Sequence, residues 1–152
     1  MRAATLLFLA AVTLYAETGF LDRQVIIDSQ TFKYQVYVPR EYTPERQWPV
    51  ILFLHGGEEP GRELPMPSAI GLGQAVRLHP SRYPAIVVMP QSAAERAWSH
   101  DLEQRQALAA LDQSIAEFNG DPLRIYLTGL SKGGHGAWRL AFREPTRFAA
   151  LA

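Results

Sequence analysis

The stretch RIYLTGLSKGGHGAWRLAFR, residues 124–143, joins an apolar run to an amphipathic segment through a serine flanked by glycines. Its first five residues are typical of a buried strand, and its last nine are typical of a helix. Ser131 lies between them in the pattern Gly-x-Ser-x-Gly, which places a serine on a sharp strand-to-helix turn. Gly129 and Gly133 allow a tight bend that a Cβ atom would crowd. The stretch therefore predicts a serine hydroxyl raised above the carboxyl edge of a sheet.

A serine on such a turn is suited to nucleophilic catalysis. The backbone N–H of Lys132 is expected to point to the place where an oxyanion would form, and the helix dipole adds positive charge there. The Lys132 side chain is expected to extend outward, and Gly134 and Gly136 to let the helix approach the sheet. The alternative is that Ser131 only caps the helix. A phosphate-binding loop is disfavoured, because the lysine does not follow the glycines.

A second glycine loop follows an earlier apolar run. The sequence LFLHGG, residues 52–57, ends a segment that is expected to form a buried strand over residues 48–54. Proteins with the Gly-x-Ser-x-Gly turn place a second oxyanion donor in such a loop, and we assign it to the N–H of Gly57. His55 is expected to have a structural role. The two motifs, about 75 residues apart and in the expected order, support each other.

The remaining segments alternate between strand and helix patterns, which indicates an α/β fold. Strands are expected at residues 24–28 and 31–39, which would form a hairpin, at 85–89, and from 148 onward. Helices are expected at 72–78 and 103–119. The turn Asn-Gly-Asp-Pro of residues 119–122 ends the second helix. The continuous apolar run at 85–89 is typical of a central parallel strand. Trp98 lies in a loop, where it either lines a substrate cleft or covers the edge of the core.

Taken together, these segments resemble an exported α/β-hydrolase of the carboxylesterase type, a group that includes feruloyl esterase-like and polyhydroxybutyrate depolymerase-like enzymes. The likeness is carried by VYVP (36–39), LFLHGG (52–57), AIVVMPQ (85–91) and RIYLTGLS (124–131). It implies an antiparallel hairpin leading into a mostly parallel sheet with flanking helices. It also implies attack by Ser131 on a small-molecule or polymer ester through an acyl-enzyme, with an Asp and a His from later loops completing the triad.

The residues after the serine depart from this pattern. The expected order is Ser, then Asp or Glu, then His, but only His135 and Glu144 follow, in the reverse order. His135 lies one helical turn after Ser131, and the turn directs the hydroxyl away from the helix surface, so it is disfavoured as the base. Glu144 is expected to be a solvated carboxylate at a helix end. The sequence therefore predicts a partial domain without the triad acid and histidine, inactive by itself. Glu58, where the family usually has a small residue, is expected to point away from the oxyanion.

Composition and the N-terminal segment limit the classes of partner and the cellular location that the sequence predicts. The chain has 15 basic and 15 acidic side chains without a basic patch, which argues against a nucleic-acid partner. Neither a cofactor nor a metal site is expected, since His, Asp and Glu have no metal-ligand spacing and cysteine is absent from the sequence. Residues 1–16 are typical of a signal peptide, which leaves a partial hydrolase domain over residues 17–152. A secreted or periplasmic protein without a stable membrane span is therefore expected.

Three alternatives to the esterase remain open from the sequence. A serine peptidase of the prolyl-oligopeptidase type and an acyltransferase use the same serine turn. A non-catalytic binding module would keep the fold and a ligand cleft without the triad. The reactivity of Ser131 separates this last class from the enzymes.

Overall fold

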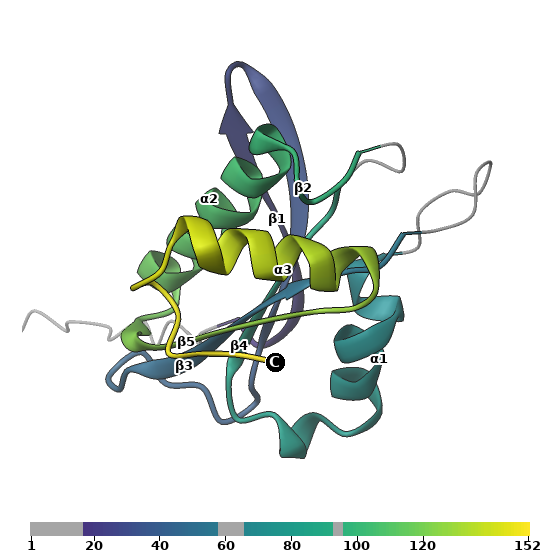
Figure 1. The fold of residues 1–152 in the computed structure, drawn as a ribbon. Helices are drawn as coiled ribbons and strands as arrows, with labels where there is room; N and C mark the ends of the chain where they lie inside the picture. The colour runs from purple at the N-terminus through teal and green to yellow at the C-terminus, as the bar shows by residue number, and fades with distance from the viewer. Residues whose placement is uncertain (1–16, 58–65, 93–95) are drawn as a thin grey trace, which may run out of the picture.

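The computed structural model describes residues 17–57, 66–92 and 96–152 (Figure 1). The elements in chain order are β1 (Gly19–Ile27), β2 (Gln30–Val38), β3 (Trp48–Leu54), a 3₁₀ turn (Pro67–Ala69), α1 (Gly71–Leu78), a second 3₁₀ turn (Pro80–Arg82), β4 (Ile86–Pro90), α2 (Asp101–Glu117), β5 (Gly120–Gly129), α3 (Lys132–Arg143) and β6 (Ala150–Leu151). The expected signal peptide and the expected orientation of Glu58 lie outside the described residues. Within the described ranges, no helix is long and apolar enough to cross a membrane.

The strands form one mixed sheet in the order β1-β2-β4-β3-β5-β6. The β1–β2 hairpin is antiparallel and β2 pairs antiparallel with β4, whereas β4, β3, β5 and β6 run parallel to one another. Asp28 and Ser29 make the tight hairpin turn, with φ of 49° and 64°. These observations confirm the predicted architecture: an antiparallel hairpin that leads into a mostly parallel sheet.

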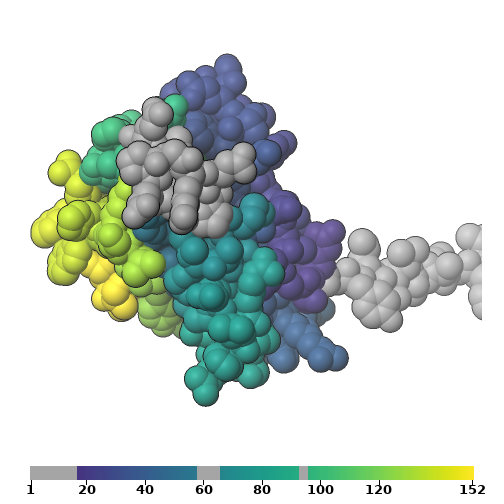
Figure 2. Space-filling view, turned by 90° about the vertical axis from the view of Figure 1, so that its right-hand side faces the viewer, coloured from purple at the N-terminus to yellow at the C-terminus, as the bar shows by residue number. Residues whose placement is uncertain are grey.

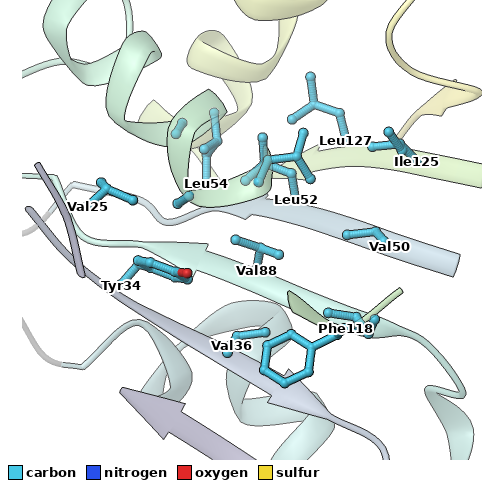
Figure 3. Close-up of a cluster of buried hydrophobic side chains, with 14 of the residues drawn as sticks. Val25, Tyr34, Val36, Val50, Leu52, Leu54, Val88, Phe118, Ile125 and Leu127 are labelled. Atoms are coloured by element: carbon cyan, nitrogen blue, oxygen red, sulfur yellow. The ribbon is translucent and has the colours of Figure 1, made fainter. Parts of the chain in front are cut away.

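Helices cover both faces of the sheet. On one face, α2 and α3 pack on a large apolar cluster that includes Leu52, Ile125 and Leu127 (Figure 3). On the other face, α1 packs through Val76 against Phe53 and neighbouring residues. In Figure 2, α1 faces the viewer, with α3 on one side of it and β1 on the other. The central strands are therefore buried on both sides, which explains the continuous apolar runs in their sequences.

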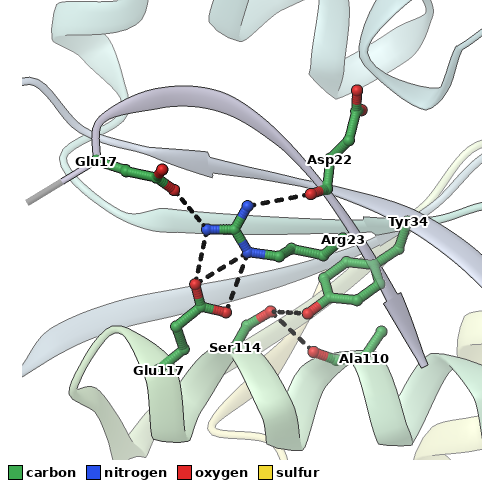
Figure 4. Close-up of polar contacts among 7 residues, drawn as sticks. All are labelled: Glu17, Asp22, Arg23, Tyr34, Ala110, Ser114 and Glu117. Atoms are coloured by element: carbon green, nitrogen blue, oxygen red, sulfur yellow. Dashed lines mark hydrogen bonds and ion pairs between the residues drawn. The ribbon is translucent and has the colours of Figure 1, made fainter. Parts of the chain in front are cut away.

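A polar cluster fastens the hairpin to the end of α2 (Figure 4). The Arg23 guanidinium on β1 donates to both carboxylate oxygens of Glu117 and, at 2.7 Å, to Glu17. Nearby, the Ser114 hydroxyl donates to the carbonyl of Ala110 at 2.8 Å. Strand β1 begins at Gly19 rather than at residue 24, because it pairs along the whole of β2, from Gly19 opposite Val38 to Ile27 opposite Gln30.

Strand β5 also differs in extent from the sequence-based expectation. Helix α2 spans Asp101–Glu117, so it begins and ends two residues earlier than the expected range of 103–119, and Asn119 lies beyond it with φ of 49°. However, β5 already begins at Gly120, where the chain pairs with Trp48 of β3. The backbone N–H of Trp48 also donates to the carbonyl of Asn119 at 3.1 Å. The predicted four-residue turn is therefore shorter. The strand expected from residue 148 is confirmed as β6, which pairs parallel with β5.

Candidate active site

Ser131 occupies the bend between β5 and α3. Its backbone has φ of 51° and ψ of −114°, a region that residues with a Cβ rarely adopt. The residue is exposed, and its side chain makes no capping hydrogen bond to the described start of α3. A strained and exposed serine that does not cap its helix is not explained by the helix-cap alternative.

Close backbone packing underlies this bend. A Cβ atom on Gly133 would lie 1.9 Å from the carbonyl oxygen of Leu54, and one on Gly136 would lie 2.1 Å from Cβ of Trp98. A Cβ on Gly134 would lie at an ordinary 3.4 Å from the carbonyl oxygen of Gly129. The expectation that Gly136 permits close approach is thus supported, whereas Gly134 lies near Gly129 of β5 with room for a Cβ atom, so close approach does not require a glycine there.

The His-Gly-Gly loop begins directly after β3. The ring of His55 is only 2% exposed, with Nδ1 2.6 Å from the carbonyl oxygen of Gly56 and Nε2 3.1 Å from the backbone N of Ser92. Burial lowers the pKa of His55, and the charge of Lys132 acts in the same direction, whereas the bond to Gly56 opposes them. His55 therefore has a structural place in the fold, as the sequence predicts.

The two glycine loops lie against each other, although they are distant in the sequence. The N–H of Leu130 donates to the carbonyl of Leu54 at 3.1 Å. A Cβ on Gly56 would lie 3.7 Å from Cβ of Ser131, and one on Gly57 would lie 3.1 Å from Cδ of Lys132. The Lys132 stem thus lies along Gly57, and the residue is partly exposed.

Trp98 joins the loop to the core. Its ring is fully buried, and its Nε1–H donates to the carbonyl oxygen of His55 at 2.8 Å. The Trp98 and His55 rings meet edge to face, with centroids 5.2 Å apart. Of the two readings of Trp98 from sequence, the structure supports the one in which it covers the core, and the ring does not line an open cleft.

Neither His135 nor Glu144 is hydrogen-bonded to the Ser131 hydroxyl. Within residues 17–57, 66–92 and 96–152, no hydrogen bond joins the Ser131 side chain to a histidine or a carboxylate. His135 is exposed on α3, where it borders a shallow hollow of about 450 Å³ together with Ser99, Trp138 and Arg139. Glu144 lies at the other end of the 12-residue helix, 3.7 Å from Arg143. These positions agree with the expectation that neither residue activates the serine.

The family model named Esterase matches residues 28–152. The chain belongs to this esterase family. Its six-stranded sheet and flanking helices are also those of solved α/β-hydrolase esterases. A search of curated proteins finds no match.

Among 402 matching solved chains, a thermostable esterase is 26% identical with a TM-score of 0.65, and the match covers 87% of this chain and 39% of that one. A ferulic acid esterase is 20% identical with a TM-score of 0.68, over 87% of this chain and 58% of that one. An acetyl xylan esterase from Aspergillus awamori is 18% identical with a TM-score of 0.62, over 86% of this chain and 50% of that one. The esterase chain therefore spans about two fifths to three fifths of the length of these structures.

Glu103 is a buried carboxylate near the site of the esterase chain that the sequence analysis did not single out. Its side chain is fully buried in the first turn of α2, and it accepts hydrogen bonds from Gln106 and, at 3.3 Å, from Arg96. Burial raises the pKa of Glu103, and Arg96 and Lys132 partly oppose that effect. A signal was present, because Glu103 lies four residues before Ala107 on the buried stripe of the helix.

The raised pKa of Glu103 predicts a pH-dependent contribution to the stability of the esterase chain. The folded state keeps this proton to a higher pH than the unfolded state does, so stability falls as pH rises from about 4.5, the ordinary value, through the folded pKa. Glu103→Gln should remove that step and should be more stable than the wild type at neutral pH. Urea unfolding between pH 4 and 8 measures both effects.

Glu45→Gln provides the matched control for this experiment. Glu45 is exposed, so its replacement should leave the difference between low and neutral pH unchanged. A Glu103→Gln variant that is less stable than the wild type at neutral pH, with the pH step intact, would contradict the assignment.

Proposed function

We propose that this chain provides the nucleophile and the oxyanion hole of a serine hydrolase that cleaves carboxylic esters through an acyl-enzyme. The single observation that carries the proposal is the contact between the serine bend and the His-Gly-Gly loop: Gly56 lies against Ser131, and Gly57 against Lys132. Membership of the esterase family supports ester hydrolysis as the reaction class. The names of the ferulic acid and acetyl xylan esterases among the similar structures support a small-molecule or polymer ester as substrate.

In the proposed reaction, Oγ of Ser131 attacks the ester carbonyl carbon while its proton passes to a general base. The carbonyl oxygen becomes an oxyanion, which the N–H groups of Gly57 and Lys132 stabilise. Collapse of this intermediate breaks the bond to the alcohol, which leaves with the proton, and the acyl group remains on the serine. Water then attacks the acyl-enzyme in the same way and releases the acid.

The base and the acid that orients it are proposed to come from outside the described residues. This assignment rests on the absence, within the described ranges, of a histidine or carboxylate bonded to the Ser131 hydroxyl. It follows that residues 1–152 alone should hydrolyse esters poorly. The sequence of residues 1–16 supports export of the enzyme as a secreted or periplasmic protein.

A fluorophosphonate probe tests this proposal, because it reacts fast only with an activated serine. We expect fast labelling of a form extended past Ala152, with the adduct mapped to the peptide that contains Ser131, and slow labelling of residues 1–152 alone. Ser99→Ala is the matched control, since Ser99 borders the neighbouring hollow on α3, and it should label like the wild type. An extended form that folds but is not labelled at Ser131 would favour the non-catalytic binding module.

A further inference from the structure

The hydrogen bonds around His55 determine which ring nitrogen carries the proton. The backbone N–H of Ser92 can only donate, so Nε2, 3.1 Å away, accepts and carries no hydrogen. The carbonyl oxygen of Gly56 can only accept, so Nδ1, 2.6 Å away, carries the hydrogen and donates it. The imidazole is therefore neutral, and each of its two nitrogens is committed to a backbone group of a different segment.

The bond from Nδ1 fixes the orientation of one peptide plane. The carbonyl of Gly56 and the N–H of Gly57 belong to the same peptide group, and every described peptide bond is trans. In a trans peptide these two groups point in opposite directions. Since His55 holds the carbonyl, the N–H of Gly57 is turned away from the imidazole ring.

This peptide has a second orientation that His55 excludes. Both of its residues are glycines, which rotate with little steric resistance because they lack Cβ. A rotated peptide would present the carbonyl oxygen where the N–H now stands, and a partial negative charge there would oppose an oxyanion. The hydrogen bond from Nδ1–H of His55 to the Gly56 carbonyl, here called the clamp, selects the productive orientation before the substrate binds.

His55, which donates the clamp, is itself held in place by groups outside the loop. Trp98 donates to the backbone carbonyl of His55 at 2.8 Å and packs on its ring. Leu54, the preceding residue, accepts from Leu130 at 3.1 Å. The imidazole is therefore held by contacts with Trp98 and Ser92 in addition to its bond to the Gly56 carbonyl, which allows the ring to act on the peptide.

We propose that His55 is a positioning residue of the oxyanion hole, whose Nδ1–H holds the Gly56 carbonyl and thereby directs the N–H of Gly57 to the developing oxyanion. This inference rests on the proposed function, in which Gly57 supplies that donor. It gives the buried histidine of the His-Gly-Gly loop a part in the rate of the reaction and not only in the fold.

Two substitutions separate the two bonds of the ring. In His55→Asn, the side-chain amide nitrogen stands near the position of Nδ1, which retains a donor to the Gly56 carbonyl and loses the acceptor for Ser92. In His55→Gln, the amide oxygen reaches the position of Nε2, which retains the acceptor for Ser92 and loses the donor to Gly56. Both replace the imidazole by an amide, so each is a control for the other.

The experiment measures kcat and KM for a p-nitrophenyl ester in the form that extends past Ala152. We expect His55→Gln to lose about 10²–10³ in kcat with KM nearly unchanged, as for removal of one oxyanion donor. His55→Asn should retain kcat within about 10-fold of the wild type, since the clamp on the peptide survives. Thermal unfolding of both variants shows whether a loss of kcat comes from unfolded protein.

The other outcomes overturn the proposal. Equal losses of kcat in the two variants would indicate a structural role alone. A larger loss of kcat in His55→Asn would assign the effect to the Ser92 bond. Wild-type kcat in both variants would exclude any effect of the clamp. Retention of turnover by Ser131→Ala would instead refute the proposed function. Nitrogen-15 NMR of the unmutated protein tests the inference independently of activity, because a hydrogen on Nε2 of His55 would contradict it.

Discussion

Replacing Ser131 by alanine is expected to reduce kcat for ester hydrolysis by about 10⁴–10⁶-fold in a form that extends past Ala152, because no other group can form the acyl-enzyme. The folded state should be unaffected, since the hydroxyl makes no capping hydrogen bond with the described residues. Steady-state hydrolysis of a p-nitrophenyl ester measures the loss, and thermal unfolding measures the stability.

Ser131→Gly provides a second test at the same position. The serine has φ of 51° and ψ of −114°, a strained conformation that glycine adopts without the same steric cost. The glycine variant should therefore be as inactive as the alanine variant and about 1 kcal/mol more stable. Substantial turnover in either variant would remove Ser131 from the mechanism, and a loss of stability in the glycine variant would contradict the strain.

Replacing Gly133 by alanine is expected to have the largest effect on stability, about 3 kcal/mol or more. The added Cβ would lie 1.9 Å from the carbonyl oxygen of Leu54 on β3, which is backbone and cannot move aside like a flexible side chain. The start of α3 would have to separate from the sheet, and the serine bend with it. Urea unfolding followed by tryptophan fluorescence measures the change.

Gly134→Ala is the matched control, one residue further along the same helix. Its Cβ would lie 3.4 Å from the nearest atom, the carbonyl oxygen of Gly129, which is an ordinary contact. Alanine is favoured over glycine inside a helix by up to about 1 kcal/mol, so this variant should be as stable as the wild type or more so. Similar destabilisation by the two substitutions would show that α3 does not depend on close approach to β3.

The sequence is sufficient to predict the sheet, its hairpin and the two glycine loops. Each of these features has a local cause: continuous apolar runs mark the strands over residues 48–54 and 86–90, and glycines mark the sharp turns. The meeting of the two loops also follows from the sequence, because parallel strands bring their carboxyl ends to the same edge of a sheet. The structure agrees, with β3 and β5 adjacent and parallel.

Other features depend on tertiary neighbours and therefore escape a reading of the sequence. Glu103 is a charged residue at a helix start, which is ordinarily exposed, yet here Arg96 and Gln106 allow it to be buried. The stem of Lys132 lies along Gly57 because the opposing loop leaves space for it. The beginning of β1 at Gly19 depends likewise on a tertiary neighbour, since the strand pairs with the whole of β2.

The parallel pairing of β3 with β5 also has a consequence for how the molecule acquires its chemistry. Val50 pairs with Ile125, about 75 positions later in the chain, and one other strand, β4, and two α-helices, α1 and α2, intervene in the sequence. Closing so large a loop is entropically unfavourable until the non-local contacts form. The serine bend and the His-Gly-Gly loop can therefore meet only late in folding, when β3 and β5 have paired.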